Sequence, residues 1–182
     1  VTERVVGPDA LLRIPRMKID RHRFVLNHRT PTPTEAAAAI SKMRVDDWQL
    51  ATLLIARTGA RIGEVVCLRG CDLDEPGGRI AFGAVDGACK TGLRWFPLDK
   101  GSLRALRGRQ ELGTDPLFDF GRVTAPIQAL ERRLFVACKA ASVSRFTPHG
   151  LRRMVVHRLM KARVDPGTAA ALTGHSVQVM LE

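Results

Sequence analysis

The chain has 182 residues, of which 45% are hydrophobic, so it can bury the core of one compact domain and is not a disordered sequence. Lys and Arg outnumber Asp and Glu by 29 to 18, and the resulting charge of +11 favours a polyanionic partner, most simply a nucleic acid. No run of apolar residues approaches the ~20 that a transmembrane helix needs, and no secretory signal pattern is present, so we expect a cytoplasmic protein without membrane contact.

The first segment, residues 1–33, carries many charges and no sustained periodicity, and we interpret it as an arm or linker remnant from a missing N-terminal domain. Thr34 as N-cap, followed by Glu35 and an alanine-rich run, predicts a helix to about residue 44. Asp46 opens a second helix that Thr58 and Gly59 stop. A shorter helix is predicted over residues 61–68, with Gly70 as its stop.

The pattern changes over residues 77–98, which predict a small antiparallel sheet with Lys90 at its turn. Helices resume over residues 102–112, 124–141, 148–163 and 166–172, and a further helix begins after Ser176. The predicted fold class is mainly α with a small antiparallel β-sheet (α+β).

The stretch T-P-H-G-L-R-R, residues 147–153, places two functional side chain types in one helical turn. Thr147 is a good N-cap and Pro148 suits the first helical position, so His149 and Arg152 face the same way beside free backbone N–H groups. Helix N-termini attract anions, so this turn can form a phosphate seat without a metal. The apolar arc of the helix predicts that Arg152 is partly buried; an exposed basic helix is the alternative for this motif alone.

Three further segments carry a resemblance: T-G-A-R-I-G-E ending at Glu64, K-T-G-L-R-W-F-P-L beginning at Lys90, and L-T-G-H-S around His175. Together with H-G-L-R, residues 149–152, they resemble the catalytic domain of the tyrosine recombinase (phage integrase) family, in the family's order along the chain. The resemblance covers residues 31–182, so it implies the fold of that domain over residues 34–182.

The resemblance implies a role for each matched residue. Arg61 and Arg152 would clamp the non-bridging oxygens of the scissile phosphate, where charge grows in the transition state. His175 would donate a further hydrogen bond to that phosphate, and His149 would bond to it or assist proton removal from the nucleophile. Lys90 would protonate the departing 5′ oxygen.

Two more features bear on the resemblance. Glu64 corresponds to the acidic residue of the first motif and could orient the Arg61 guanidinium, with a helix-surface ion pair as its alternative. Thr173 replaces the leucine that commonly precedes the motif's glycine, a departure that we expect to concern packing.

The serious departure is the nucleophile, because the sequence contains no tyrosine. The family places it about nine residues after His175, two positions past Glu182. We favour a chain cut before its C-terminal tyrosine segment, since the last seven residues resemble the approach to the nucleophile helix. The other explanation is a natural protein that kept the phosphate pocket and lost catalysis.

The implied activity is site-specific DNA recombination through a 3′-phosphotyrosine intermediate, without cofactor or metal. The implied setting is the bacterial nucleoid, with double-stranded DNA as partner and a homotetramer on DNA for the full-length protein. We expect the chain as given to be a monomer that binds DNA but is inactive. The alternative from another class is a non-catalytic DNA-binding module that retains the phosphate pocket.

Overall fold

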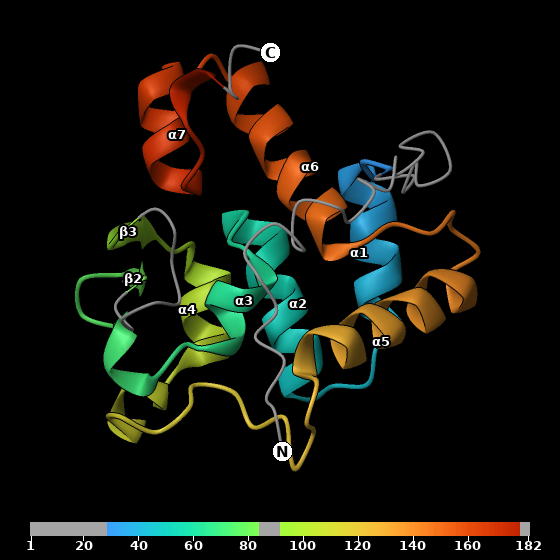
Figure 1. The fold of residues 1–182 in the computed structure, drawn as a ribbon, viewed down its shortest axis with the longest axis horizontal. Helices are drawn as coiled ribbons and strands as arrows, with labels where there is room; N and C mark the ends of the chain where they lie inside the picture. The colour runs from blue at the N-terminus through green and yellow to red at the C-terminus, as the bar shows by residue number, and fades with distance from the viewer. Residues whose placement is uncertain (1–28, 84–91, 179–182) are drawn as a thin grey trace, which may run out of the picture.

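The structure is a computed structural model that describes residues 29–83 and 92–178. The described chain is mostly helical with one small antiparallel sheet, which confirms the predicted fold class (Figure 1). In chain order the elements are α1 (Pro33–Ser41), α2 (Asp47–Thr58), α3 (Ile62–Val66), η2 (Gly70–Asp72), β1 (Leu73–Asp74), β2 (Arg79–Phe82), β3 (Arg94–Pro97), α4 (Lys100–Leu106), η3 (Arg109–Leu112), α5 (Pro126–Ala140), α6 (Pro148–Lys161) and α7 (Pro166–Thr173). None of the described helices has the length and apolar character needed to cross a bilayer.

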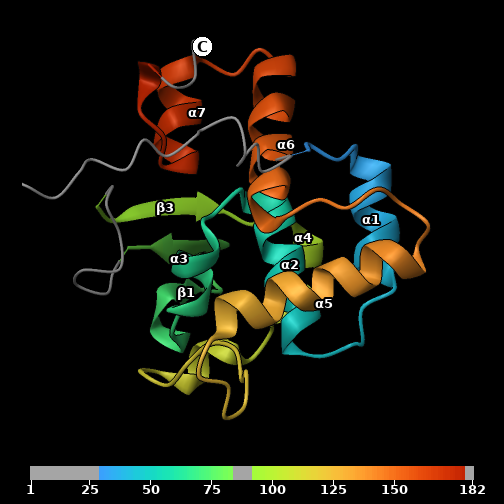
Figure 2. The same ribbon diagram turned by 45° about the vertical axis from the view of Figure 1, so that its right-hand side comes forward.

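Helix α2 forms the centre of the main core. As predicted, the Asp46 side chain caps its N-terminus by accepting from the Gln49 N–H, and Gly59 ends it in the left-handed conformation. The helix packs against α1, α3, α4, α5 and α6, and Ala51 and Ile55 on it are fully buried. Figure 2 shows α5 crossing in front of α2, so that most of the domain is built around this one helix.

Several predicted helix boundaries are corrected by the structure; the first helix, expected to reach about residue 44, ends at Ser41. Thr32, not Thr34, caps α1, because its hydroxyl accepts from the Glu35 N–H while the Glu35 carboxylate accepts from the Thr32 N–H. The helix expected to reach residue 68 ends at Val66. The helix expected over residues 102–112 is broken at Gly108, which takes a positive φ of 78° between α4 and η3.

The sheet has the order β1-β2-β3, and each neighbouring pair is antiparallel. Strands β2 and β3 were predicted, and their register pairs Ile80 with Phe96 and Phe82 with Arg94. Strand β1 was not predicted, because two residues are too few to show an alternating pattern. The predicted turn at Lys90 lies outside the described residues.

Helix α6 connects the main core to a second, smaller cluster. Leu151 and Met154 in its first half are buried in the main core, whereas Leu159 in its second half packs against Ala169 and Ala170 of α7. Helix α7 also contacts β3. The start of α6, the end of α7, the turn between α2 and α3, and β3 therefore meet in one region of the domain (Figure 1).

Candidate functional site

The turn between α2 and α3 positions Arg61. Gly59 leaves α2 with a positive φ of 68°, and Arg61 then adopts an extended conformation as the N-cap of α3. The Glu64 carboxylate accepts from the backbone N–H of Arg61 at 2.8 Å and from its Nη1 at 3.0 Å. The side chain of Glu64 is only 1% exposed, so the alternative of a helix-surface ion pair is wrong. Glu64 orients the Arg61 guanidinium from within the core, while the Arg61 side chain remains 38% exposed.

Arg152 is buried more deeply than the sequence predicts, with 2% of its surface exposed. It lies on α6, whose N-terminus is capped by the Thr147 side chain, as predicted. Its Nη1 donates to the Gly59 carbonyl at 2.5 Å, and its Nη2 donates to the Gly174 carbonyl at 3.2 Å. A buried arginine needs such partners because an unpaired charge in the core is costly. The guanidinium is thus fixed between the end of α2 and the end of α7.

The Gly174 carbonyl is the point where the two arginines converge. Gly174 ends α7 in the left-handed conformation, with its N–H bonded to the Ala170 carbonyl. Its own carbonyl accepts from Arg61 Nη2 at 2.7 Å and from Arg152 Nη2 at 3.2 Å. Two positive forks from different elements therefore share one neutral oxygen, which places them close enough to bind two oxygens of a single anion.

His175 follows Gly174 and lies against Arg152. The Arg152 Nε–H donates to Nε2 of the imidazole at 3.1 Å. Burial, and then the charges of Arg152, Arg61, His149 and Arg94, lower the pKa of His175 from 6.5 to about 4. The ring is therefore neutral near neutral pH. The exposed His149, at the start of α6, lies close enough to affect this pKa, so the structure brings together both predicted histidines.

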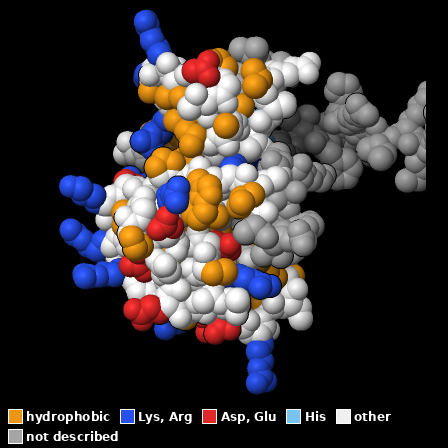
Figure 3. Space-filling view, turned by 90° about the vertical axis from the view of Figure 1, so that its left-hand side faces the viewer, with side chains coloured by type: hydrophobic (Ala, Val, Ile, Leu, Met, Phe, Trp, Pro, Cys, Tyr) orange, Lys and Arg blue, Asp and Glu red, His pale blue; other side chains and the backbone are white. Residues whose placement is uncertain are grey.

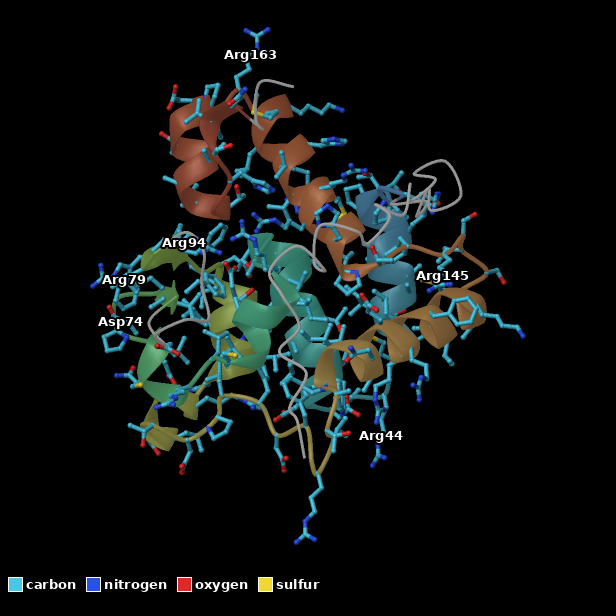
Figure 4. The ribbon with its side chains drawn as sticks, viewed as in Figure 1. Arg44, Asp74, Arg79, Arg94, Arg145 and Arg163 are labelled. Atoms are coloured by element: carbon cyan, nitrogen blue, oxygen red, sulfur yellow. The ribbon has the colours of Figure 1, made fainter. Side chains whose placement is uncertain are left out.

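Arg94 is a site residue that the sequence analysis missed. It lies between β3 and α7 (Figure 4), and its side chain is 8% exposed. Its Nη1 and Nη2 donate to the two oxygens of Glu64 at 3.1 and 2.5 Å, and its Nε donates to the Leu172 carbonyl at 3.2 Å. The alternation of β3 held a signal, because Arg94 shares a face with the inward-facing Phe96 and a charge on that face needs a buried partner.

Gly150 in the H-G-L-R motif is required by a close approach of the chain. A Cβ at this position would lie 2.4 Å from the carbonyl oxygen of Arg29 and 3.3 Å from Pro31. The segment before α1 thus crosses directly over the first turn of α6. Its position is fixed by Arg29, which donates to the Ser144 carbonyl and pairs with Glu35.

The structure corrects the expectation that threonine in place of leucine at position 173 affects only packing. The side chain is fully buried, but its hydroxyl donates to the Ala169 carbonyl at 2.7 Å and lies 3.0 Å from Nδ1 of His175. It therefore touches a predicted site residue. Lys90, the remaining predicted member of the site, lies outside the described residues.

The electrostatics of the site favour an anion. Glu64 is one carboxylate shared by Arg61 and Arg94, while neutral carbonyls and an imidazole hold Arg152. The N-terminus of α6 adds partial positive charge. No group of three or more His, Cys, Asp or Glu side chains that could hold a metal occurs among residues 29–83 and 92–178. On the face shown in Figure 3, lysine and arginine side chains are interspersed with acidic and hydrophobic ones.

Comparison with solved structures shows what this fold is. XerA recombinase matches with a TM-score of 0.69 and 24% identity over 83% of this chain and 56% of that chain. The catalytic domain of bacteriophage HP1 integrase matches with a TM-score of 0.63 and 16% identity over 84% of both chains. The chain has the fold of a recombinase catalytic domain. The Tn1549 transposon integrase, in complex with circular intermediate DNA, shares this recombinase fold with a TM-score of 0.67 and 19% identity over 84% of this chain and 61% of that one.

The recombinase fold is thus shared at low sequence identity. No protein-family model matches the chain, and no curated protein matches its sequence. The chain spans little more than half the length of the XerA chain that it matches. Within the recombinase fold, the structure brings together Arg61, Glu64, His149, Arg152 and His175, which are the predicted site residues that it describes.

Proposed function

We propose that the chain is the phosphate-binding part of the catalytic domain of a site-specific DNA recombinase or integrase that acts through a tyrosine nucleophile. The observation that carries the proposal is the convergence of Arg61 and Arg152 on the Gly174 carbonyl. Solved structures of the same fold support DNA as the substrate, since the Tn1549 integrase is in complex with circular intermediate DNA and the XerH site-specific recombinase is bound to its difH substrate.

In this proposal a DNA phosphate lies against Arg61, whose side chain is 38% exposed, directly beside the buried Arg152. The guanidinium groups of Arg61 and Arg152 donate to its two non-bridging oxygens, and these bonds strengthen as charge develops on the pentacoordinate phosphorus. His175 donates a further hydrogen bond. His149 bonds to the phosphate or accepts the proton of the nucleophile, and Lys90 protonates the 5′ oxygen as it leaves.

The covalent step needs a tyrosine hydroxyl. Its oxygen attacks phosphorus, the bond to the 5′ oxygen breaks, and the products are a 3′-phosphotyrosyl link and a free 5′ hydroxyl; attack by a partner strand's hydroxyl reverses the step. None of the 182 residues is a tyrosine, so this chain by itself binds DNA without forming that link. The proposal extends to assembly of the whole protein as a homotetramer on two DNA sites.

One observation favours a second function. A DNA-binding module that holds backbone phosphates through Arg61 and Arg152, without catalysis, accounts for a sequence that lacks tyrosine. The two functions differ in one product, a covalent protein–DNA adduct.

The test expresses the gene to its own stop codon and incubates the protein with nicked duplexes made from DNA that flanks the gene. A denaturing gel then detects a covalent adduct, with EDTA present to exclude metal-dependent cleavage. Arg61→Ala is the site variant, because Arg61 is partly exposed and its loss leaves the core intact. Arg44→Ala is the matched control, since Arg44 is exposed and lies at the opposite end of the molecule from α7 (Figure 4).

Recombinase function predicts an adduct that Arg44→Ala retains and Arg61→Ala abolishes, with DNA binding largely kept in both variants. An adduct that persists in Arg61→Ala would refute the site assignment. DNA binding without any adduct would favour the binding module.

A further inference from the structure

His175 can be protonated on either ring nitrogen when it is neutral, and the choice decides what it can do for a phosphate. Both nitrogens face Arg152, with Nε2 at 3.1 Å from Nε and Nδ1 at 3.1 Å from Nη2. Arginine only donates hydrogen bonds. It therefore favours a lone pair on each ring nitrogen equally and does not choose between the two tautomers.

Thr173 makes the environments of the two ring nitrogens of His175 different. Its hydroxyl hydrogen is used in the 2.7 Å bond to the Ala169 carbonyl, so toward Nδ1 of His175, 3.0 Å away, it presents a lone pair. Among the described residues it is the one hydrogen-bond acceptor in contact with either ring nitrogen. The proton of the neutral ring consequently lies on Nδ1, and Nε2 keeps the lone pair that accepts from Arg152.

Backbone hydrogen bonds also hold His175 in place relative to Thr173. Gly174 and His175 both donate their N–H groups to the Ala170 carbonyl, at 2.8 and 3.1 Å, which fixes the turn that carries the imidazole. Thr173 itself is fully buried in the last turn of α7. The hydroxyl is thus a rigid reference point, and the ring orients against it.

We propose that Thr173 is a positioning residue that holds His175 protonated on Nδ1, so that Nε2 can donate to a phosphate oxygen only after the ring takes up a second proton. This inference rests on the proposed phosphate site, which it deepens with a linkage between DNA binding and proton uptake. The groups that face the imidazole are Arg152 and His149 from α6, Arg61 from the start of α3, and Arg94 from β3. All four oppose protonation in the free protein, and a bound phosphate reverses that balance.

The sign of the pH dependence of DNA binding follows from the direction in which a bound phosphate changes the pKa of His175. The free ring has a lowered pKa of about 4, and an adjacent phosphate anion raises it. Binding therefore takes up a proton between the two pKa values, and each unit of falling pH in that window strengthens DNA binding by up to about tenfold. A ring with its proton on Nε2 would already donate to the phosphate while neutral, so binding would take up less of a proton and the pH dependence would be shallower.

The first measurement is the tautomer in the free protein. The imidazole of His175 is observed by NMR in protein labelled at its five histidines, with His175→Gln used to assign the signal. We expect the Nδ1–H tautomer in the wild type and in Thr173→Ser, which keeps the hydroxyl. Thr173→Val keeps the branched shape and removes the hydroxyl, and we expect it to shift the ring toward the Nε2–H tautomer. A wild-type ring protonated on Nε2, or a tautomer unchanged in Thr173→Val, overturns the proposal.

The second measurement is the affinity for a short labelled DNA duplex as a function of pH. The chain has five histidines, so the readout is the difference between variants. We expect the wild type and Thr173→Ser to gain affinity more steeply than Thr173→Val as pH falls. Parallel curves overturn the linkage to phosphate, whereas failure of every variant to bind DNA would refute the proposed function while leaving the tautomer result intact.

Discussion

Replacement of Glu64 by glutamine tests how the site is held together. One oxygen of the Glu64 carboxylate accepts from the backbone N–H of Arg61, and the other accepts from Nη1 of the same residue. Each oxygen also accepts from one terminal nitrogen of Arg94. A glutamine amide keeps one acceptor oxygen and turns its NH₂ group toward a guanidinium. The substitution therefore removes the carboxylate that pairs with Arg94, whose side chain is 8% exposed.

We expect Glu64→Gln to lower the free energy of unfolding by about 3–5 kcal/mol, the cost of removing one partner from a buried ion pair. For a domain of this size the melting temperature should fall by about 10 °C. Urea and thermal unfolding measure both quantities. Glu111→Gln, which removes a carboxylate from the exposed 3₁₀ turn η3, should leave stability nearly unchanged.

A double variant separates charge burial from packing. If the cost comes from the uncompensated Arg94 charge, Glu64→Met combined with Arg94→Met should be more stable than Glu64→Gln alone. A loss below about 1 kcal/mol in Glu64→Gln would show that the pair is solvated, as exposed ion pairs are, and would refute its role as the internal support of Arg61.

Three further outcomes are expected. Gly59→Ala should lower the free energy of unfolding in urea by about 1–2 kcal/mol, because Gly59 has a positive φ and the added Cβ would lie 3.1 Å from the Val155 side chain. Gly63→Ala is the control and should be neutral or stabilising, because the space around Gly63 is open. The Thr32 N–H, and then Arg29, lower the pKa of Glu35 from 4.5 to about 2. The contribution of Glu35 to stability is therefore complete above pH 4.5 and is lost as the pH falls toward 2. Urea unfolding measured across this pH range should show that Glu35→Gln lacks this pH dependence. DNA binding that neutralises about six phosphates should give a slope of about −5 for log affinity against log salt, measured by fluorescence anisotropy.

The sequence predicted those features that local patterns determine. Asp46 and Gly59 marked both ends of α2, and Thr147 with Pro148 marked the start of α6. The three-residue spacing of Arg61 and Glu64 also translated directly into a contact, because a helical turn brings such residues together. These signals depend on residues only a few positions apart.

The missed features depend on partners that are distant in sequence. Arg94 is a site residue because β3 packs beside α3 and α7, where Glu64 and the Leu172 carbonyl lie. The role of Thr173 became visible only when the left-handed turn at Gly174 brought the imidazole back over the last turn of α7. The alternation of β3 indicates only that Arg94 faces inward, and no local pattern specifies its partners or the contact between Thr173 and the imidazole.

The crossing of the chain over Gly150 constrains how this protein can change in evolution. Since the Arg29 carbonyl occupies the space of a side chain at position 150, no larger residue can appear there while residues 29–31 keep their path. A rerouted entry into the domain would release that position and also uncover the first turn of α6, beside His149. Relatives with another residue between this histidine and Arg152 should therefore enter the domain along a different route.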